Sequence, residues 1–244
     1  MIPKIIHYCW FGRNPLPESA TKCIASWRKF FPDYEIKEWN EDNFDINIIP
    51  YTAEAYSVKK YAFVSDYARF WILYHYGGLY FDTDVEVIKN MYDIIDRGPF
   101  MGIEVDANEG SSPAIAPGLG LGAESYMKLY RDVLDYYKLQ NFLNNDGSFN
   151  QVTVVRHVTK VLEKHGLQPT NELQEVSGIW IYPRDFFNPL DDFTGRLNIT
   201  DNTRAIHWYM RSWSDSSNFR IALSRWSHRL FGDLIIKIKK QITK

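Results

Sequence analysis

The sequence predicts a single α/β domain with a mostly parallel sheet flanked by helices. Short apolar runs of strand length alternate with longer segments of helical periodicity, which is the order typical of a parallel sheet. A length of 244 residues fits one domain with elaborations and a substantial core. In such sheets, ligands bind beyond the carboxyl ends of the strands.

The first half of the chain contains the segments that predict the centre of this fold. Lys4–Trp10 is apolar enough for a buried central strand, and Glu54–Tyr76 is a helix too hydrophobic for the surface. Gly77-Gly78 ends that helix, because glycine tolerates the left-handed turn past a helix end, and Leu79–Phe81 follows as a short buried strand. The other elements expected here are a helix at Glu18–Phe31, a strand at Tyr34–Trp39 and a helical turn at Asp42–Ile49.

The second half continues with shorter elements and one long loop. Ser111–Gly122 is rich in Gly, Pro and Ala, which is typical of a loop, either one that contacts a substrate or a mere connection. Apolar spacing predicts helices at Glu124–Phe142 and Gln151–His165. Strands are expected at Val85–Ile88, Pro99–Val105, Ile179–Tyr182 and Arg204–Trp208.

Asp82 and Asp84 lie at the end of the predicted strand Leu79–Phe81. Because side chains alternate along an extended chain, both carboxylates point to one side. Two carboxylates there suit a hard divalent cation, which prefers oxygen ligands and keeps waters or substrate phosphates in its other positions. An isolated Asp-x-Asp triplet is common by chance, so its value depends on the surrounding residues.

Asp66 and Arg69 fall on the preceding helix, three positions apart and hence on one face. Charged side chains in so apolar a helix are costly unless they are paired or used. Two interpretations stay open: a buried structural ion pair that pins the helix to the sheet, or a functional pair beside the aspartates. His7, in the first strand, is interpreted as a core histidine rather than a ligand.

The composition argues against several classes of protein. A net charge of −2 does not fit a general nucleic-acid binder. Cys9 and Cys23 have neither metal-site nor disulfide spacing, which fits a reducing compartment. No signal peptide is visible and no apolar run is long enough to span a bilayer, so we expect a cytoplasmic protein that is soluble or at most peripheral.

Residues 225–244 are expected to form a separate basic helix after a domain at 1–224. Six basic side chains against the single Asp233 give +5, which leaves −7 for the first 224 residues. One helical face would carry Leu230, Phe231, Leu234, Ile235, Ile238 and Ile242. This pattern is typical of a helix on an anionic membrane surface, and equally of a terminal helix packed on the core with a solvated basic face.

Several short segments, taken together and in order, carry a resemblance to a known family. They are Ile2–Gly12, Ser26-Trp27, Pro32-Asp33-Tyr34, Ser65-Asp66 with Arg69, Gly77–Tyr80 with Asp82 and Asp84, His207-Trp208 and Ser212-Trp213. They cover nearly the whole chain and resemble the DXD-containing sugar transferases of glycosyltransferase family 32, the capsular-polysaccharide and mannosyltransferase-like group. The chain is more remotely similar to the glucosyltransferase domains of large clostridial toxins.

This resemblance implies a GT-A fold with a Rossmann-like sheet, a nucleotide-sugar donor, Mn²⁺ or Mg²⁺, and retention of the anomeric configuration. It implies that Asp84 is the direct metal ligand, that Asp82 contacts the donor ribose or a metal-bound water, and that His207 is a metal or diphosphate ligand. The other implied donor contacts are base stacking by Trp10, sugar and diphosphate binding by Asp66 and Arg69, and closing-loop contacts by Ser212 and Trp213, which are spaced differently in the toxins.

Elementary chemistry agrees with these implied roles. Transfer from a nucleotide donor leaves charge on a departing diphosphate, which a metal and a guanidinium stabilise with little reorganisation. The planar fork of Arg69 suits a phosphate because it donates two parallel hydrogen bonds. Retention by front-face attack and retention by double displacement through a carboxylate both stay open.

We therefore expect a metal-dependent glycosyltransferase, with a UDP-sugar favoured, that extends a surface or capsular polysaccharide at the inner face of the membrane. Its acceptor would be an oligosaccharide or a lipid-linked glycan. One alternative is an aspartate-nucleophile phosphatase, in which Asp82 is phosphorylated and Asp84 is the acid/base. Another is a non-catalytic carbohydrate-binding module, which the many tryptophans favour but which leaves Asp82, Asp84 and Arg69 unexplained.

Overall fold

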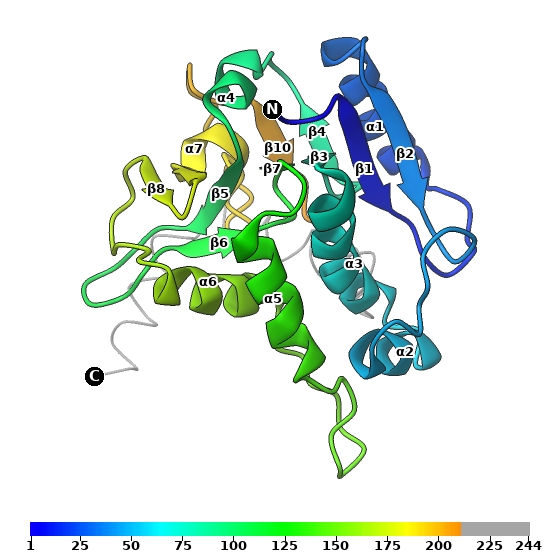
Figure 1. Ribbon diagram of the computed structural model, residues 1–244. Helices are drawn as coiled ribbons and strands as arrows, with labels where there is room; N and C mark the ends of the chain where they lie inside the picture. The colour runs from blue at the N-terminus through cyan, green and yellow to red at the C-terminus, as the bar shows by residue number, and fades with distance from the viewer. Residues whose placement is uncertain (211–244) are drawn as a thin grey trace.

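A computed structural model describes residues 1–210 of the chain (Figure 1). The expected basic helix at 225–244 and the expected closing-loop residues Ser212 and Trp213 lie outside the described residues. Within residues 1–210, no helix combines the length and the apolar character needed to cross a membrane.

An eight-stranded sheet forms the centre of the described chain, in the order β2-β1-β3-β7-β5-β9-β8, with β6 paired to β5. Its strands are β1 (Ile5–Cys9), β2 (Glu35–Trp39), β3 (Gly78–Tyr80), β5 (Phe100–Val105), β6 (Ala114–Ala116), β7 (Leu121–Ala123), β8 (Gln174–Val176) and β9 (Ile179–Tyr182). Strands β2, β1, β3, β5 and β9 share one direction, because β7 is antiparallel to both β3 and β5. The predicted α/β class is confirmed.

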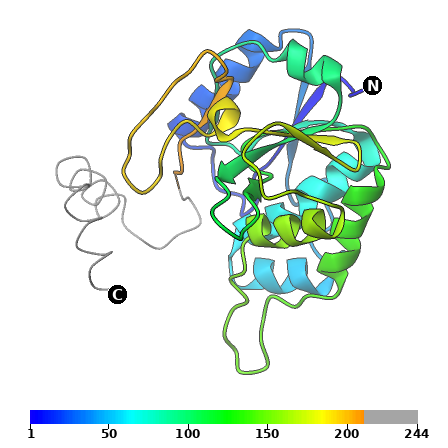
Figure 2. The same ribbon diagram turned by 90° about the vertical axis from the view of Figure 1, so that its left-hand side faces the viewer.

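Other elements cover both faces of this sheet (Figures 1 and 2). One side carries α2 (Pro50–Ser57), α3 (Tyr61–Tyr76), α5 (Lys128–Lys138) and α6 (Val154–Lys164), and the other carries α1 (Glu18–Phe30), α4 (Tyr92–Arg97), α7 (Arg184–Phe187) and a two-stranded sheet of β4 (Val85–Val87) and β10 (Ala205–His207). Each side has its own buried core. Along β3, Tyr80 packs into the first core and Leu79 into the second, as the alternation of a strand requires.

The junction between α3 and β3 forms as the sequence predicts. Gly77 ends α3 with a φ of 64°, and Gly78 begins β3 with a φ of 98°. A Cβ atom on Gly78 would lie 2.6 Å from the carbonyl oxygen of Ile5, so a larger residue has no room beside β1. The glycine pair thus lets the chain turn from the most buried helix straight into the centre of the sheet.

The predicted continuous helix Glu54–Tyr76 is wrong, because the structure has two helices there. Lys59 adopts a left-handed conformation with a φ of 60°, and the backbone N–H of Lys60 donates to the carbonyl of Ala55 at 2.9 Å. These features end α2 before α3 begins. Periodicity did not reveal the break, since apolar and aromatic residues continue across it.

The predicted loop Ser111–Gly122 is also wrong in part, because it contains β6 and most of β7. A Cβ atom on Gly122 would lie 2.3 Å from the ring of Phe100, so the small residues of β7 serve close packing rather than a turn. The helices α5 and α6 are shorter than predicted, and α4, α7 and β8 were not predicted.

Candidate functional site

The Asp-x-Asp segment lies at the carboxyl end of β3, in the middle of the sheet. β3 lies between β1 and β7, and the side chain of Phe81 beyond it is fully buried. The backbone N–H of Asp82 donates to the carbonyl of Gly118 at 3.2 Å, and that of Val85 donates to the carbonyl of Asp82 at 3.0 Å. This turn holds Asp82 and Asp84 at the sheet edge, where parallel α/β sheets bind ligands.

His207 reaches the same place from a distant part of the chain. β10 pairs antiparallel with β4, so that His207 lies opposite Val85, directly after the Asp-x-Asp segment. Its Nε2 atom lies 3.1 Å from Oδ1 of Asp84. One potential ligand atom from each of Asp82, Asp84 and His207 lies within 4.8 Å of the other two, which is a spacing that can hold a metal ion. We call these three residues the Asp-Asp-His cluster.

Asp84 is held by the backbone as well as by His207. Its Oδ2 atom accepts a hydrogen bond from the N–H of Met210 at 2.9 Å, and its carbonyl accepts one from the N–H of Trp208 at 3.0 Å. Burial alone would raise the pKa of Asp84, but the His207 imidazole and the Met210 N–H hold it below its usual range. For His207 both directions are reversed: burial alone would lower its pKa, but the Asp84 carboxylate raises it. The ionised carboxylate is therefore favoured here.

Arg69 connects the predicted helical pair to Asp82. Its Nη2 atom donates to Oδ1 of Asp66 at 2.9 Å, and its Nη1 atom donates to Oδ2 of Asp82 at 3.3 Å. The guanidinium lies 4.9 Å from the ring centre of Tyr80, and its side chain is only 4% exposed. Burial raises the pKa of Asp66 to about 7, although Arg69 beside it acts in the opposite direction. Arg69 thus forms a buried ion pair with Asp66 and also contacts the Asp-x-Asp segment, which is compatible with both interpretations that the sequence left open.

The remaining predicted residues are less directly connected to the cluster. Trp10 follows β1, so it lies at the same edge of the sheet as the aspartates, and its indole N–H donates to the carbonyl of Asn14 at 2.6 Å. His7 is fully buried and hydrogen-bonded to the indole of Trp39 and the carbonyl of Gly77, as expected of a core histidine. Cys9 and Cys23 are free and buried.

Two residues beside the cluster were missed by sequence reasoning. Glu104 lies near the carboxyl end of β5, and Oε1 of its side chain accepts a hydrogen bond from the hydroxyl of Tyr209 at 3.3 Å. The ring of Tyr209 lies 4.2 Å from that of His207, centre to centre. Burial raises the pKa of Glu104, although His207 acts against it. A glutamate at the end of an otherwise apolar strand was the one available signal.

Gly118 is a third missed residue, and it supports Asp82 through its lack of a side chain. A Cβ atom at this position would lie 2.0 Å from Oδ2 of Asp82 and 3.3 Å from Nη1 of Arg69. The turn between β6 and β7 therefore presses its backbone directly against the carboxylate that Arg69 holds.

Comparison with known proteins agrees with this geometry. Residues 17–101, which include α1, α3 and the Asp-x-Asp segment, match the family described as the glycosyltransferase sugar-binding region containing DXD motif. This part of the chain is similar to the sugar-binding region of the DXD glycosyltransferases. Arg69, Asp82 and Asp84 lie inside the matched residues, whereas His207 lies beyond them.

Relatives of this chain extend the match to different degrees. An uncharacterized glycosyltransferase of Acanthamoeba polyphaga mimivirus is 27% identical over 197 residues, which cover 77% of this chain and 76% of that protein. Inositol phosphoceramide mannosyltransferase 1 of Schizosaccharomyces pombe is 29% identical over 111 residues, 41% of this chain and 33% of that enzyme. Inositol phosphoceramide mannosyltransferase 3 of the same yeast is 36% identical over 92 residues, which cover 34% of this chain and 24% of that enzyme. The match thus spans a third or less of these yeast enzymes.

A solved structure shows the same fold. The PaToxG glycosyltransferase superposes with a TM-score of 0.50 at 18% identity, covering 67% of this chain and 69% of that chain. The predicted GT-A type of sheet is confirmed. The comparisons favour neither the phosphatase nor the carbohydrate-binding module.

Proposed function

We propose that this glycosyltransferase moves a sugar from a nucleotide-sugar donor to a glycan acceptor, with a divalent cation and with retention of the anomeric configuration. The observation that carries the proposal is the Asp-Asp-His cluster with Arg69 beside it, at the carboxyl edge of a DXD glycosyltransferase sheet. A UDP-sugar is the favoured donor.

The residues of the cluster fit Mn²⁺ or Mg²⁺. Two carboxylates supply the hard oxygen ligands that these cations prefer, and one imidazole nitrogen completes the set. Among the described residues, Nδ1 of His207 is buried without a hydrogen-bond partner, so the ring is held through its Nε2 side. When bound, the cation supplies positive charge that stabilises a departing diphosphate. Asp84 would be the principal ligand, with Asp82 contacting the ribose or a metal-bound water.

The other donor contacts would come from the sheet edge and from the last part of the chain. The guanidinium of Arg69 is always positively charged. Its buried contacts with Asp66 and Asp82 hold it in one orientation. It would bind the donor diphosphate, with Asp66 on the donor sugar and Trp10 stacked on the base. Ser212 and Trp213 would close over the donor and exclude water. Front-face attack and double displacement remain the two routes to retention.

The acceptor side of the proposal is an oligosaccharide or a lipid-linked glycan in surface or capsular polysaccharide synthesis. The yeast relatives are named for inositol phosphoceramide, which is a lipid. A lipid-linked acceptor agrees with a basic helix at 225–244 on the anionic inner face of a membrane, next to a cytoplasmic catalytic domain. Nucleic acid is not a proposed partner, since the net charge is −2.

Thermal unfolding with nucleotide sugars tests the donor and the metal together. UDP- and GDP-sugars are added with Mn²⁺, Mg²⁺ or EDTA to the intact chain, to Asp84→Asn, and to the control Asp33→Asn. Asp33 is a suitable control because its partners are Lys4 and Tyr92, outside the cluster. A ligand at about 100 times its Kd adds about 2.7 kcal/mol of stability, so a rise of several degrees is expected.

The result expected is stabilisation by one nucleotide sugar only when metal is present, lost in Asp84→Asn and kept in Asp33→Asn. Calorimetry then gives the affinity, and sugar transfer is sought with acceptors. Stabilisation that is equal in EDTA would overturn the metal-dependent proposal. Absence of any nucleotide effect, together with turnover of a generic phosphate ester, would favour the phosphatase instead.

A further inference from the structure

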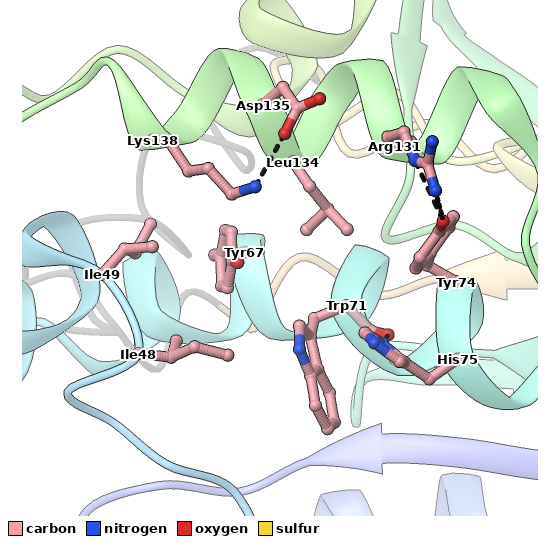
Figure 3. A pocket seen from close by; sticks show the side chains of 10 residues that line it. All are labelled: Ile48, Ile49, Tyr67, Trp71, Tyr74, His75, Arg131, Leu134, Asp135 and Lys138. Atoms are coloured by element: carbon pink, nitrogen blue, oxygen red, sulfur yellow. Dashed lines mark hydrogen bonds and ion pairs between the residues drawn. The ribbon is translucent and has the colours of Figure 1, made fainter.

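A groove lies on the side of α3 away from the Asp-Asp-His cluster (Figure 3). Its volume is about 560 Å³, which is in the usual range for ligand sites. Tyr67, Trp71, Tyr74 and His75 of α3 form its floor, α5 forms one wall, and the segment just before α2 forms another. Asp66 and Arg69 point roughly the opposite way around the same helix, since a residue advances about 100° per position.

Aromatic rings and charged groups alternate along this groove. Trp71 and His75 lie ring to ring at 4.4 Å, which holds the indole in place. Arg131 of α5 lies over the ring of Tyr74 and donates to its hydroxyl at 2.6 Å from Nη2. Lys138 and Asp135 form an ion pair at 2.7 Å on the same wall (Figure 3). The groove therefore combines partly exposed aromatic rings on its floor with hydrogen-bonding groups of both signs on its rim.

Three polar atoms on the groove floor have hydrogen-bonding capacity to spare. Among the described residues, the indole N–H of Trp71 and the hydroxyl of Tyr67 have no hydrogen-bond partner; Trp71 is half-buried, and Tyr67 is 2% exposed. Nδ1 of His75 lies 2.8 Å from the carbonyl of Trp71, so that nitrogen carries the proton and donates. Nε2 of neutral His75 is then left as an acceptor. These atoms follow one face of α3, at intervals of four residues.

We propose that this groove binds an uncharged oligosaccharide, as a second carbohydrate site separate from the donor site. A sugar ring places its C–H face on an aromatic ring while its hydroxyls need donors and acceptors around the edge, and the groove supplies both. Ile48, Ile49 and Leu134 add aliphatic surface, but a lipid chain would leave the polar groups of the floor and rim without partners, and a nucleic acid would need an excess of cations. The inference rests on the proposed function, because a glycan-extending enzyme has an acceptor chain long enough to contact its surface outside the reaction centre.

NMR of the indole N–H groups tests the site directly. The chain has 8 tryptophans, so the cross-peak missing from Trp71→Phe identifies Trp71 in the spectrum of the intact protein. The probes are uncharged oligosaccharides of mannose, glucose and galactose, two to six units long, at millimolar concentration and without nucleotide or metal. At least one is expected to shift the Trp71 signal in a saturable way.

Variants separate this groove from general surface effects. Lys138→Ala and Arg131→Ala change exposed rim residues without opening the core, and Trp71→Phe removes only the indole edge. Binding to every variant is measured by calorimetry, because Trp71→Phe lacks the NMR signal, and loss of one aromatic or rim contact is expected to weaken binding about threefold to tenfold. The matched control is Lys164→Ala, because Lys164 is exposed in the last turn of α6 and does not line the groove. Its binding should equal that of the intact chain.

The outcomes separate the groove from the donor site. Asp84→Asn is expected to bind the oligosaccharide normally, since Asp84 lies outside the groove. If no probe shifts the Trp71 signal, or if Lys138→Ala, Arg131→Ala and Trp71→Phe all bind as tightly as Lys164→Ala, the second site is overturned, whatever the nucleotide experiment gives. If oligosaccharides bind but no nucleotide sugar does, the groove stands and the transferase proposal fails.

Discussion

His7 shows how one buried residue links the first strand to the helix end that positions the site. The indole N–H of Trp39 donates to its Nδ1 atom at 3.0 Å, so Nδ1 is an acceptor. Nε2 therefore carries the proton and donates to the carbonyl of Gly77 at 3.0 Å. A second proton on Nδ1 would face the indole N–H, and burial lowers the pKa of His7 to about 4.

This hydrogen-bond pattern predicts loss of stability in mild acid. An unfolded histidine takes up a proton near pH 6.5 and the folded His7 only near pH 4, so the free energy of unfolding falls as the pH drops between these values. From pH 7 to pH 5, His7 should account for a loss of about 2 kcal/mol. His7→Gln, which can still donate to Gly77 but does not titrate, should lose that much less over the same interval in urea unfolding. An equal loss in both proteins would contradict this account.

Residue types in the first half of the chain were enough to predict that four charged side chains of the candidate site lie near one another. Asp66 and Arg69 lie on α3, and Asp82 and Asp84 follow β3 directly, so local geometry brings them together. Glu104 could not be found in the same way, because its position beside His207 depends on where β5 and β10 lie in space. His207 was predicted only through family resemblance.

At the scale of elements, β7 is the feature that sequence patterns conceal. A strand between β3 and β5 is buried on both faces, and close neighbours leave room only for small residues such as Gly122. The same composition is typical of surface loops, so a loop was predicted. The sequence alone does not show that this segment lies between β3 and β5, where small residues are needed for close packing. The insertion of β7 also brings the preceding turn, with Gly118, against Asp82.

Gly118→Ala should impair the site more than the fold. The added methyl group would have to displace the Asp82 carboxylate or the turn itself, and such overpacking costs about 1–3 kcal/mol. We expect affinity for Mn²⁺ with UDP to fall about tenfold or more in calorimetry, with an unchanged far-UV circular dichroism spectrum.

Gly147→Ala is the matched control for this change. Gly147 also lies in a loop, and a Cβ atom there would have no heavy atom within 4 Å. Its φ of 80° means that alanine costs some backbone strain and nothing else, so nucleotide affinity should be kept. Equal affinities for the two variants would show that Gly118 does not support Asp82.

At the scale of the whole molecule, one sheet separates two cores, and the functional groups gather at one edge of it. The core beneath α3 and α5 holds the Arg69 side of the site, and the core beneath α1, β4 and β10 holds the His207 side. The alternation of strands and helices predicted this layering from the sequence, because it depends on periodicity. The order of the strands did not follow from periodicity, since it is set by contacts between distant segments.

The charge distribution gives a prediction for the whole chain. Residues 225–244 carry +5 and the first 224 residues carry −7, so attraction to an anionic surface would be confined to the C-terminal part. Deleting residues 234–244 should release the protein from phosphatidylserine vesicles in a sedimentation assay.

Charge and hydrophobicity can be separated in the same assay. Replacing Lys237, Lys239 and Lys240 by glutamine should weaken binding by about 1 kcal/mol for each lysine, and added salt should reduce the difference. The intact chain should not sediment with neutral phosphatidylcholine vesicles. Vesicle binding that survives the deletion would show that another surface contacts the membrane.

The pairing of β10 with β4 has a consequence for the order in which the molecule becomes active. About half of the chain lies between Asp84 and His207, and the N–H of Met210 is needed to hold the Asp84 carboxylate. A ribosome that has made only the strands and helices up to α6 has produced both aspartates but neither the imidazole nor that N–H. A nascent chain at that stage can hold Asp82 beside Arg69, but it lacks the contacts of His207 and Met210 that hold Asp84, so the proposed cation site is incomplete. If the proposed function holds, a nucleotide-sugar donor would thus be spared from an unfinished enzyme that could cleave it without an acceptor.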